Sequence, residues 1–365
     1  MKLSERAYWV GFNLVKGVGP VRVRRLLERF GSLEAAWLAS SDELREADFD
    51  KRALNSFLTA RQKLDLGAEM ARLDRLGIAV LTWDDEDYPA LLKPLRQIDA
   101  APPLLYLRGT LDPGDEWALT VVGTRSVSAY GRQVTHQITS ELALNRLTIV
   151  SGLARGVDGT AHQAALEAGG RTIALLGCGL DTIYPPEHRG LAAKIISQGA
   201  VMTPYPLGTQ PESRKFHWRN NIMSGMARGV LVTEAGAKSG ALVTVRYALE
   251  QGREVFAVPG NITQANSDGT NQLIRDGAIP VLSAQDILEA LNLEQVATYQ
   301  TVRSAAPNMS SDEQAILALL SSDPLHVDEL TRQAALPVSQ VSSTLAMLEL
   351  KGVVRQVATM TYVRS

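Results

Sequence analysis

The chain has 365 residues and a mass of 39.5 kDa, more than one average domain, and its 45% hydrophobic residues are enough to build ordinary cores. Its formal net charge of -2 excludes a surface that is positive throughout, so a nucleic-acid site would have to be a local patch. A single cysteine, Cys178, excludes an internal disulfide framework and a multi-cysteine metal site, and the five histidines lack ligand spacing.

No apolar stretch reaches the length of a membrane span, and the N-terminal residues MKLSERAYWVGF lack the apolar core of a signal peptide. We therefore expect a cytoplasmic protein with no membrane contact.

Residues 1–87 are predicted to form a helical domain. The segment KGVGPVRVRRLLERFGS places a Gly-Val-Gly turn before an amphipathic helix, which is typical of a helix-hairpin-helix (SAM-like) module. Such a hairpin can present backbone amides to phosphate. Four arginines would reinforce that role: Arg22, Arg24, Arg25 and Arg29. The alternative is a small packing domain whose basic face is only solvated.

Residues 88–291 are predicted to form an α/β domain with a doubly wound, Rossmann-like parallel sheet. Seven near-continuous apolar runs, from ALTVVG to AIPVLS, alternate with helix-sized segments, as in a parallel sheet covered on both faces. Every strand-to-helix loop of such a sheet emerges at the carboxyl edge, where ligands bind. The turns Ser151-Gly152 and Ser239-Gly240 each precede a helical run, whose free N–H groups suit a phosphate.

One segment of this domain combines cations with aromatic rings. Residues 213–233 contain no Asp or Glu but several cations, including Lys215 and Arg219, with Phe216 and Trp218 among them. A cation beside an exposed ring is the pairing that binds single-stranded nucleic acid, one group for the phosphate and one for the base. The alternative is that both rings belong to the core.

Residues 292–310 are predicted to be a linker, and residues 311–365 a winged helix of three short helices and a hairpin. The latter segment has six acids against four cations, a net charge of -2. Its presumed recognition helix offers only uncharged polar residues: Ser339, Gln340, Ser342 and Ser343. We therefore expect a protein-contact or weakly DNA-binding module.

The motifs of common nucleotide enzymes are missing from the sequence. There is no G-x-G-x-x-G fingerprint after VVG and no G-x-x-x-x-G-K-[ST] loop, so we expect no cofactor. Cys178 fits a tight turn better than a nucleophile, and His162 and His188 fit structural positions better than bases. The sequence therefore favours a protein that is not an enzyme.

Acidic residues leave one catalytic candidate. Glu234 follows the strand run GVLVT and would lie at the carboxyl edge, where a catalytic acid would sit. Asp158 is better explained as a cap of the GVDGTAH helix, and Asp181 as part of the LDTIYPP turn.

Seven motifs occur in one order between Val121 and Ala278: VVGTR, SGLARGVDGTAH, GCGLDTIYP, FHWRNNI, SGALVT, FAVPG and GTNQLIRDGA. Through them the chain resembles the DNA-processing protein A family (DprA, also called Smf), and its helical and winged-helix modules fit that family's three-part plan. The resemblance implies a non-catalytic protein that binds and protects single-stranded DNA and helps to load a RecA-type recombinase onto it in natural transformation. It also implies a homodimer joined through the central domain.

The resemblance assigns the DNA pocket to three groups of residues. These are Gly123, Thr124 and Arg125 of the first loop, Lys215, Phe216, Arg219 and Asn220 of the F-x-x-R-N segment, and Ser151, Gly152, Ser239 and Gly240 of the two Ser-Gly turns. The sequence departs from the family pattern at Trp218, at Asn221 and at Thr203-Pro204.

Two alternatives stay open. The doubly wound core is also similar to that of the lysine-decarboxylase-like nucleotide phosphoribohydrolases, but EAGAKSGALVT lacks their P-G-G-x-G-T loop and the catalytic acid that follows it. The second alternative is an interaction-only scaffold in which the pocket has no use.

Overall fold

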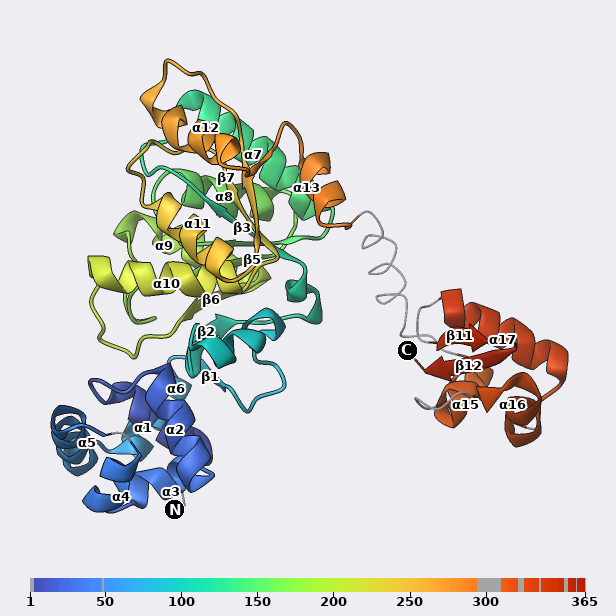
Figure 1. Cartoon of the computed structure of the whole chain (residues 1–365), viewed down its shortest axis with the longest axis horizontal. Helices are drawn as coiled ribbons and strands as arrows, with labels where there is room; N and C mark the ends of the chain where they lie inside the picture. The colour runs from blue at the N-terminus through green and yellow to red at the C-terminus, as the bar shows by residue number, and fades with distance from the viewer. Residues whose placement is uncertain are drawn as a thin grey trace. The chain divides into compact units, whose positions relative to one another are not determined.

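The structure, a computed structural model, describes residues 3–47, 49–293, 310–320, 325–334, 336–350, 354–358 and 360–364. The chain divides into two compact units, Met1–Ile287 and Leu288–Ser365 (Figure 1). Residues 294–309, most of the predicted linker, lie outside the described residues. The predicted domain boundaries stay predictions. One strand within the predicted helical domain 1–87 is described below.

The N-terminal part is helical, as predicted. Its helices are α1 (Glu5–Leu14), α2 (Pro20–Phe30), α3 (Leu33–Leu38), α4 (Ser41–Glu46), α5 (Lys51–Lys63) and α6 (Leu66–Arg75). Short polar side chains accept hydrogen bonds from the first free N–H groups of four of them: Ser32, Ser40, Asp50 and Asp65. The rings of Phe12, Trp37 and Phe57 meet with centroids 5.1–5.3 Å apart and form the centre of this helical core.

The helical prediction for residues 1–87 is wrong at its end. Strand β1 (Ala79–Thr82) belongs to the large sheet and pairs antiparallel with β2 (Leu104–Gly109), which in turn pairs antiparallel with β6. Neither strand is among the seven predicted runs. β2 is not followed by a helix that would mark it as part of a parallel unit.

The remaining strands are parallel and confirm the predicted sheet. They are β3 (Ala118–Val122), β4 (Thr148–Ser151), β5 (Thr172–Leu175), β6 (Ala200–Thr203), β7 (Gly229–Val232), β8 (Glu254–Ala257) and β9 (Ile279–Pro280). The sheet has the order β1-β2-β6-β5-β4-β3-β7-β8-β9. Every residue of β3 to β7 is buried, which explains why these strands are almost entirely apolar, with only Thr and Ser as polar members.

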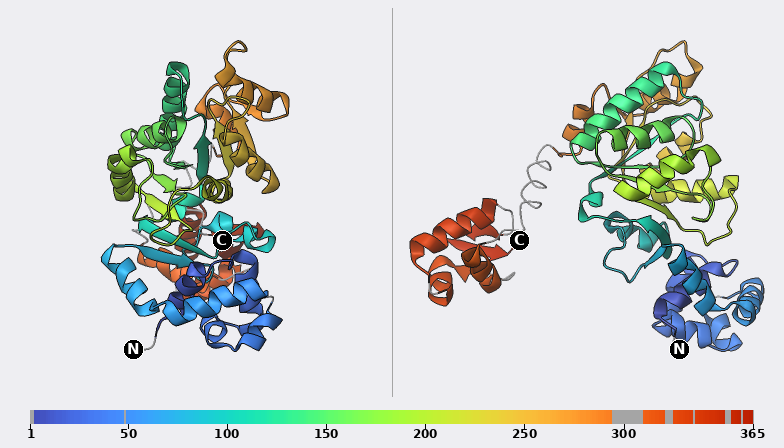
Figure 2. Two further views of the ribbon diagram at one scale, coloured as in Figure 1. Left: turned by 90° about the vertical axis from the view of Figure 1, so that its left-hand side faces the viewer. Right: turned by 180° about the vertical axis from the view of Figure 1, so that it is seen from behind.

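Helices cover both faces of this sheet. α7 (Ala129–Leu144), α8 (Val157–Glu167) and α9 (Arg189–Gln198) lie on one face, and α11 (Ala241–Glu250) and α12 (Asp268–Arg275) on the other (Figure 2). α10 (Ser213–Gly225) packs against α11, and α13 (Ala284–Ala290) follows β9. Short 3-10 turns complete the unit: η1 (Ala90–Leu92), η2 (Pro94–Ile98), η3 (Pro113–Glu116), η4 (Pro186–His188) and η5 (Ala265–Ser267).

The second unit confirms the predicted winged helix. It contains α15 (Ser311–Leu319), α16 (Val327–Ala334) and α17 (Val338–Leu350), with strands β10 (Leu325–His326), β11 (Val354–Ala358) and β12 (Thr361–Arg364) in the order β10-β12-β11. Its own core includes Ile316, Leu330, Val341 and Leu345.

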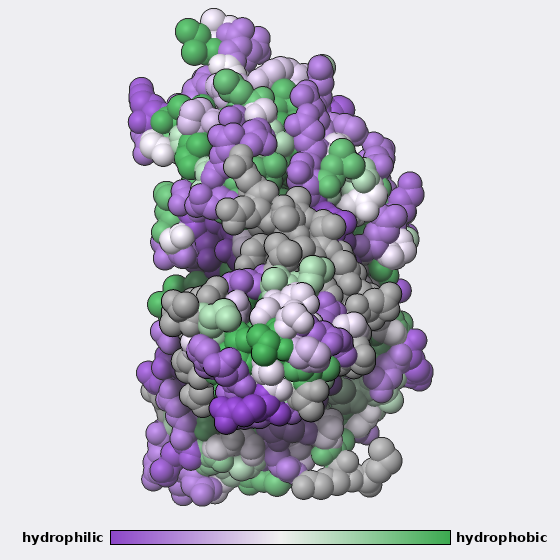
Figure 3. All heavy atoms as spheres, turned by 90° about the vertical axis from the view of Figure 1, so that its right-hand side faces the viewer, coloured by the Kyte–Doolittle hydropathy of each residue, from purple (hydrophilic) through white to green (hydrophobic). Residues whose placement is uncertain are grey.

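On the face drawn in Figure 3, hydrophilic residues cover most of the described surface and hydrophobic ones form small separate groups.

Two glycines test how closely the sheet packs. Gly109 ends β2 with φ +101°, and a Cβ there would lie 2.2 Å from the carbonyl oxygen of Gly199, whereas Gly169, with φ +73°, has nothing within 4 Å. Gly109→Ala should therefore lower the free energy of unfolding by about 1–3 kcal/mol more than Gly169→Ala, because only Gly109→Ala adds a backbone clash to the shared cost of the left-handed conformation.

Urea denaturation followed by tryptophan fluorescence measures this difference, since every tryptophan lies in the first unit. Equal unfolding free energies for the two variants would show that β2 can move away from Gly199.

Candidate nucleic-acid interface

The strand order reverses at β3. From β3 the chain runs outward through β4, β5 and β6, then returns to place β7 on the opposite side of β3. In open α/β sheets such a reversal leaves a crevice outside the carboxyl ends of the strands. A pocket of about 560 Å³ opens there. It is lined by most of the predicted site residues: Gly123, Thr124, Arg125, Phe216, Arg219, Asn220, Ser239 and Gly240.

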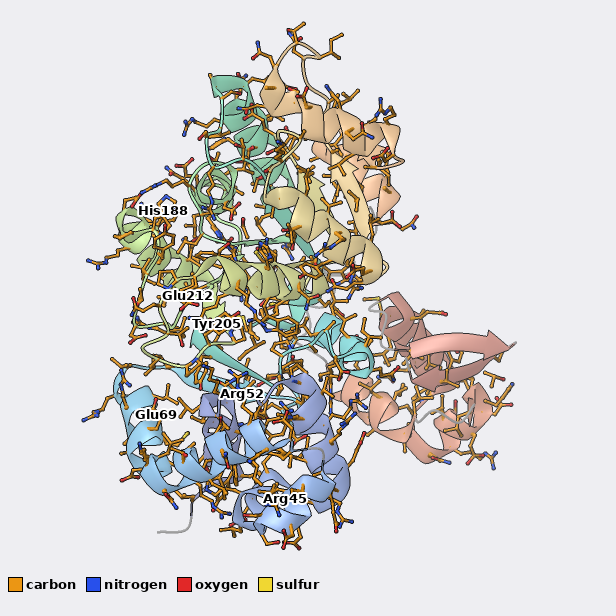
Figure 4. The ribbon with its side chains drawn as sticks, turned by 60° about the vertical axis from the view of Figure 1, so that its left-hand side comes forward. Arg45, Arg52, Glu69, His188, Tyr205 and Glu212 are labelled. Atoms are coloured by element: carbon orange, nitrogen blue, oxygen red, sulfur yellow. The ribbon has the colours of Figure 1, made fainter. Side chains whose placement is uncertain are left out.

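Segments far apart in the sequence surround this edge of the sheet. Figure 4 labels three residues of these segments: His188 at the end of η4, Tyr205 after β6 and Glu212 directly before α10. The convergence of these loops confirms the expectation from the parallel strands.

Arg219 forms the buried floor of the pocket. Its side chain is only 5% exposed, and its Nη1 lies 3.9 Å from Oδ2 of Asp158. Burial lowers the pKa of Arg219. The guanidinium group is so strongly basic that the side chain nevertheless stays charged. Its buried Nε has no hydrogen-bond partner among the described residues. A buried, unsatisfied donor of this kind could be satisfied by an oxygen atom of a ligand.

Gly152 and Asp158 hold Arg219 in this position. A Cβ on Gly152 would lie 1.3 Å from Nη1 of Arg219, so only glycine leaves room for the guanidinium. The Asp158 carboxylate accepts hydrogen bonds from the backbone N–H groups of Gly152 and Ala154, at 3.1 and 3.3 Å. Contrary to the sequence prediction, Asp158 does not cap α8, because the N-cap residue is Gly156; it holds the loop before the helix and provides the counter-charge of Arg219.

Phe216 lies one helical turn before Arg219 on α10 and lines the same pocket. The guanidinium carbons of Arg219 and Arg125 lie 5.6 and 5.9 Å from the centroid of its half-buried ring. The predicted combination of a ring with cations is therefore present in three dimensions.

Arg125 is the exposed cation of the pocket, held by a rigid loop. The Thr124 N–H donates to the carbonyl oxygen of Glu234 at 2.7 Å, and the Thr124 carbonyl accepts from Val157 N–H at 3.2 Å. In the part of the chain that the structure describes, no carboxylate forms an ion pair with Arg125. A phosphate would therefore not have to displace an acid from it.

Three predicted site residues do not line the main pocket. Ser151 is fully buried, and its Oγ donates to the carbonyl oxygen of Val121 at 2.7 Å, so this hydroxyl joins two strands and cannot reach a ligand. Lys215 donates from Nζ to Glu212 at 2.8 Å and to the carbonyl oxygen of Gln210 at 3.0 Å. Glu212, which directly precedes the acid-free segment 213–233, therefore forms an ion pair with Lys215. Gly152 lines only a shallow neighbouring cleft.

The structure adds pocket residues that the sequence prediction missed. Lys238 is exposed on the turn after β7, and Asn266 belongs to the η5 turn, far along the chain. Lys238 belongs to the turn EAGAKSG, which follows a predicted strand. Its position could therefore have been used to predict that it lies at the pocket. Nothing in the sequence near Asn266 indicates that η5 returns to the pocket.

Trp218 lies apart from the pocket. It is half-buried against the core and lines a separate cavity of about 180 Å³ together with Trp9 and Phe12 of α1. The core alternative thus holds for Trp218, whereas Phe216 lies at the pocket.

The candidate catalytic groups are engaged elsewhere. The Glu234 carboxylate accepts a 2.8 Å hydrogen bond from the N–H of Ser128, which directly precedes α7. Glu234 does not line the pocket. Burial raises the pKa of the Cys178 thiol to about 11, which disfavours the thiolate. His162 is fully buried, which lowers its pKa to about 3, and its Nδ1 shares a hydrogen bond with Thr172 Oγ1.

Three of the four arginines of the predicted hairpin are engaged by acids. Arg22 pairs with Asp50 at 2.6 Å and Arg24 with Asp99 at 3.1 Å. Arg29 pairs with Glu46. These contacts favour the alternative of a packing domain over a phosphate site.

Across the described ranges, no group of three His, Cys, Asp or Glu side chains is arranged to hold a metal ion. Within the same residues, no helix combines the length and the apolar character that crossing a membrane requires.

The chain matches two family models: DNA recombination-mediator protein A over residues 79–292, and the DprA winged helix domain over residues 300–358. It is similar to Protein Smf of Synechocystis sp., with 36% identity over 400 aligned positions and 100% of both chains covered. The solved structure of DNA processing protein A from Streptococcus pneumoniae is 33% identical, with a TM-score of 0.67 over 79% of this chain and 98% of that one.

A further solved structure is that of DNA processing protein A from Helicobacter pylori, reported for its single-stranded DNA binding mode. It is 29% identical, with a TM-score of 0.51 over 60% of this chain and 96% of that one. Because the first family model spans more than half of the chain and the Synechocystis relative aligns along its whole length, this chain belongs to the DNA processing protein A (DprA/Smf) family.

Proposed function

We propose that this chain binds single-stranded DNA in the pocket at the switch point of its sheet. One observation carries the proposal: the guanidinium carbons of Arg125 and Arg219 lie 5.9 and 5.6 Å from the ring centroid of Phe216, in the same pocket. The Helicobacter pylori relative, reported to bind single-stranded DNA, supports it.

The pocket offers different groups to the two parts of a nucleotide. Exposed Arg125 and Lys238 suit phosphates, and the ring of Phe216 suits an unpaired base. The predicted free N–H groups after Ser239-Gly240 are not available, because those of Ala241, Leu242 and Val243 already donate to Ser239 and Gly240. A duplex hides its base faces, so the ring contributes only to single-strand binding.

We also propose that the protein acts without catalysis. Glu234 holds the start of α7, and Cys178 and His162 are buried, so each acid or base considered from the sequence already has a structural partner. These contacts weigh against the phosphoribohydrolase alternative.

The proposed cellular role is to protect single-stranded DNA and to help a RecA-type recombinase to load onto it during natural transformation, as a homodimer joined through the central domain. The family model described as a recombination mediator supports this role. Added protein should shorten the lag of recombinase assembly on DNA coated with a single-strand-binding protein, and Arg125→Ala should remove the effect. An unchanged lag with the unaltered chain would contradict the role.

Single-strand preference tests the proposed activity. In a fluorescence anisotropy competition, an unlabelled single strand should displace a labelled one at a lower concentration than a duplex of the same length, because only unpaired bases can stack on Phe216. Affinity should also fall steeply as salt rises, since counterions are released when arginines meet phosphates. Equal competition by the duplex would contradict single-strand binding in this pocket.

Two arginine variants locate the site in the same assay. Arg125→Ala should weaken binding by about tenfold or more, because a hydrogen bond to a charged group contributes about 1.5–3 kcal/mol. Arg24→Ala is the control, since Arg24 is already paired with Asp99. A larger loss from Arg24→Ala would place the site in the helical part.

Gly152→Ala tests whether buried Arg219 must keep its position. The new Cβ would overlap Nη1 of Arg219 and force the guanidinium away from Asp158, so single-strand affinity should fall by about tenfold. Gly190→Ala is the matched control outside the pocket, because a Cβ there meets nothing within 4 Å.

Circular dichroism establishes that both glycine variants are folded. A folded Gly152→Ala variant that binds like the unaltered chain would show that binding does not need this arrangement of Arg219.

A further inference from the structure

A second aromatic ring stands beside the pocket. Tyr184 belongs to the loop between β5 and η4, and its ring centroid lies 5.9 Å from that of Phe216, with the planes tilted by 33°. Both rings line a shallow cleft of about 30 Å³ that adjoins the main pocket through Arg125 and Arg219. The aromatic surface therefore continues past Phe216.

Phe216 is the more enclosed ring of the two. A Cβ on Gly177 would lie 2.5 Å from its Cδ1, so one side of the ring rests on the chain at Gly177. The guanidinium carbons of Arg219 and Arg125 lie 5.6 and 5.9 Å from its centroid. Tyr184, by contrast, is 40% exposed. Of the two rings, Tyr184 offers the larger open surface to a base.

A cation lies in the same cleft. Arg155 lines it, and Arg155 Nε donates to Glu187 at 2.5 Å, with both side chains about half exposed. Exposed ion pairs of this kind contribute little, about 0–1 kcal/mol. A phosphate can therefore compete with Glu187 for Arg155 at small cost.

We propose that Tyr184 is a second stacking residue for single-stranded DNA, and that Arg155 binds a phosphate next to the base stacked there. This inference rests on the proposed function: a strand held in the main pocket by Arg125 and Arg219 passes Phe216 and reaches Tyr184 through the adjoining cleft. Because every base has a π face, the contact adds affinity without sequence preference.

The tyrosine hydroxyl is not needed for this role. Among the described residues, the Tyr184 hydroxyl forms no hydrogen bond, so its removal leaves no partner unsatisfied. Tyr184→Phe should therefore bind single strands as the unaltered chain does. Tyr184→Leu keeps apolar bulk without a π face and should weaken binding by about tenfold, the equivalent of about 1.4 kcal/mol.

The experiment is a titration of the full chain with a fluorescein-labelled oligothymidylate at several salt concentrations. Tyr184→Leu should lower affinity and leave the salt slope unchanged, whereas Arg155→Ala should reduce the slope by about one unit because a phosphate contact is lost. Tyr130→Leu is the control: this tyrosine is 49% exposed and lines neither cavity. Thermal melts establish that each variant is folded.

The outcomes separate this inference from the proposed function. If the unaltered chain does not bind the oligonucleotide, the proposed function fails. If it binds, and Arg125→Ala weakens binding while Tyr184→Leu does not, only the second stacking site is overturned. Equal losses for Tyr184→Leu and Tyr184→Phe would also overturn it, because the ring would then be irrelevant.

Discussion

The buried ion pair between Arg219 and Asp158 is the interaction on which the site depends. A buried charge is costly unless it is paired, and here the partner carboxylate is itself fixed by the backbone N–H groups of Gly152 and Ala154. The end of β4, the start of α8 and the middle of α10 meet at this point. Because glycine at position 152 leaves the only room for the guanidinium, these three segments fix one another's positions.

Around this fixed floor, side chains and backbone at the carboxyl edge of the sheet hold the loops in place. Glu234 occupies the position where many α/β enzymes place an acid, yet its carboxylate binds the N–H of Ser128 and its carbonyl binds the N–H of Thr124. These bonds hold the loop that carries Arg125. The chain is nearly neutral overall, and its cations differ in availability: Arg22, Arg24 and Arg29 of the N-terminal helices are engaged by acids, whereas Arg125 is open to a ligand.

The parallel strands were predictable because burial on both faces makes them almost entirely apolar. The rule that their loops meet at one edge predicted where the site lies, and the family resemblance assigned its individual residues. β1 and β2 escaped prediction because antiparallel strands at the end of a sheet need no following helix. The separation of Phe216 from Trp218 follows from helix geometry, since residues two apart point to different sides. No local pattern reveals that Asn266 lies at the pocket or that the hydroxyl of Ser151 is buried, because both depend on tertiary packing.

The most direct test of the central claim is photocrosslinking of an oligonucleotide with scattered 5-iodouracil to the intact chain, followed by mass spectrometry of the crosslinked peptides. If the switch-point pocket is the DNA site, crosslinks should concentrate on the peptides that carry Tyr184 and Phe216, which line it and its adjoining cleft. Crosslinks found mainly in α2 or α17, with none at these rings, would contradict the account and place the DNA on the N-terminal helices or on the winged helix.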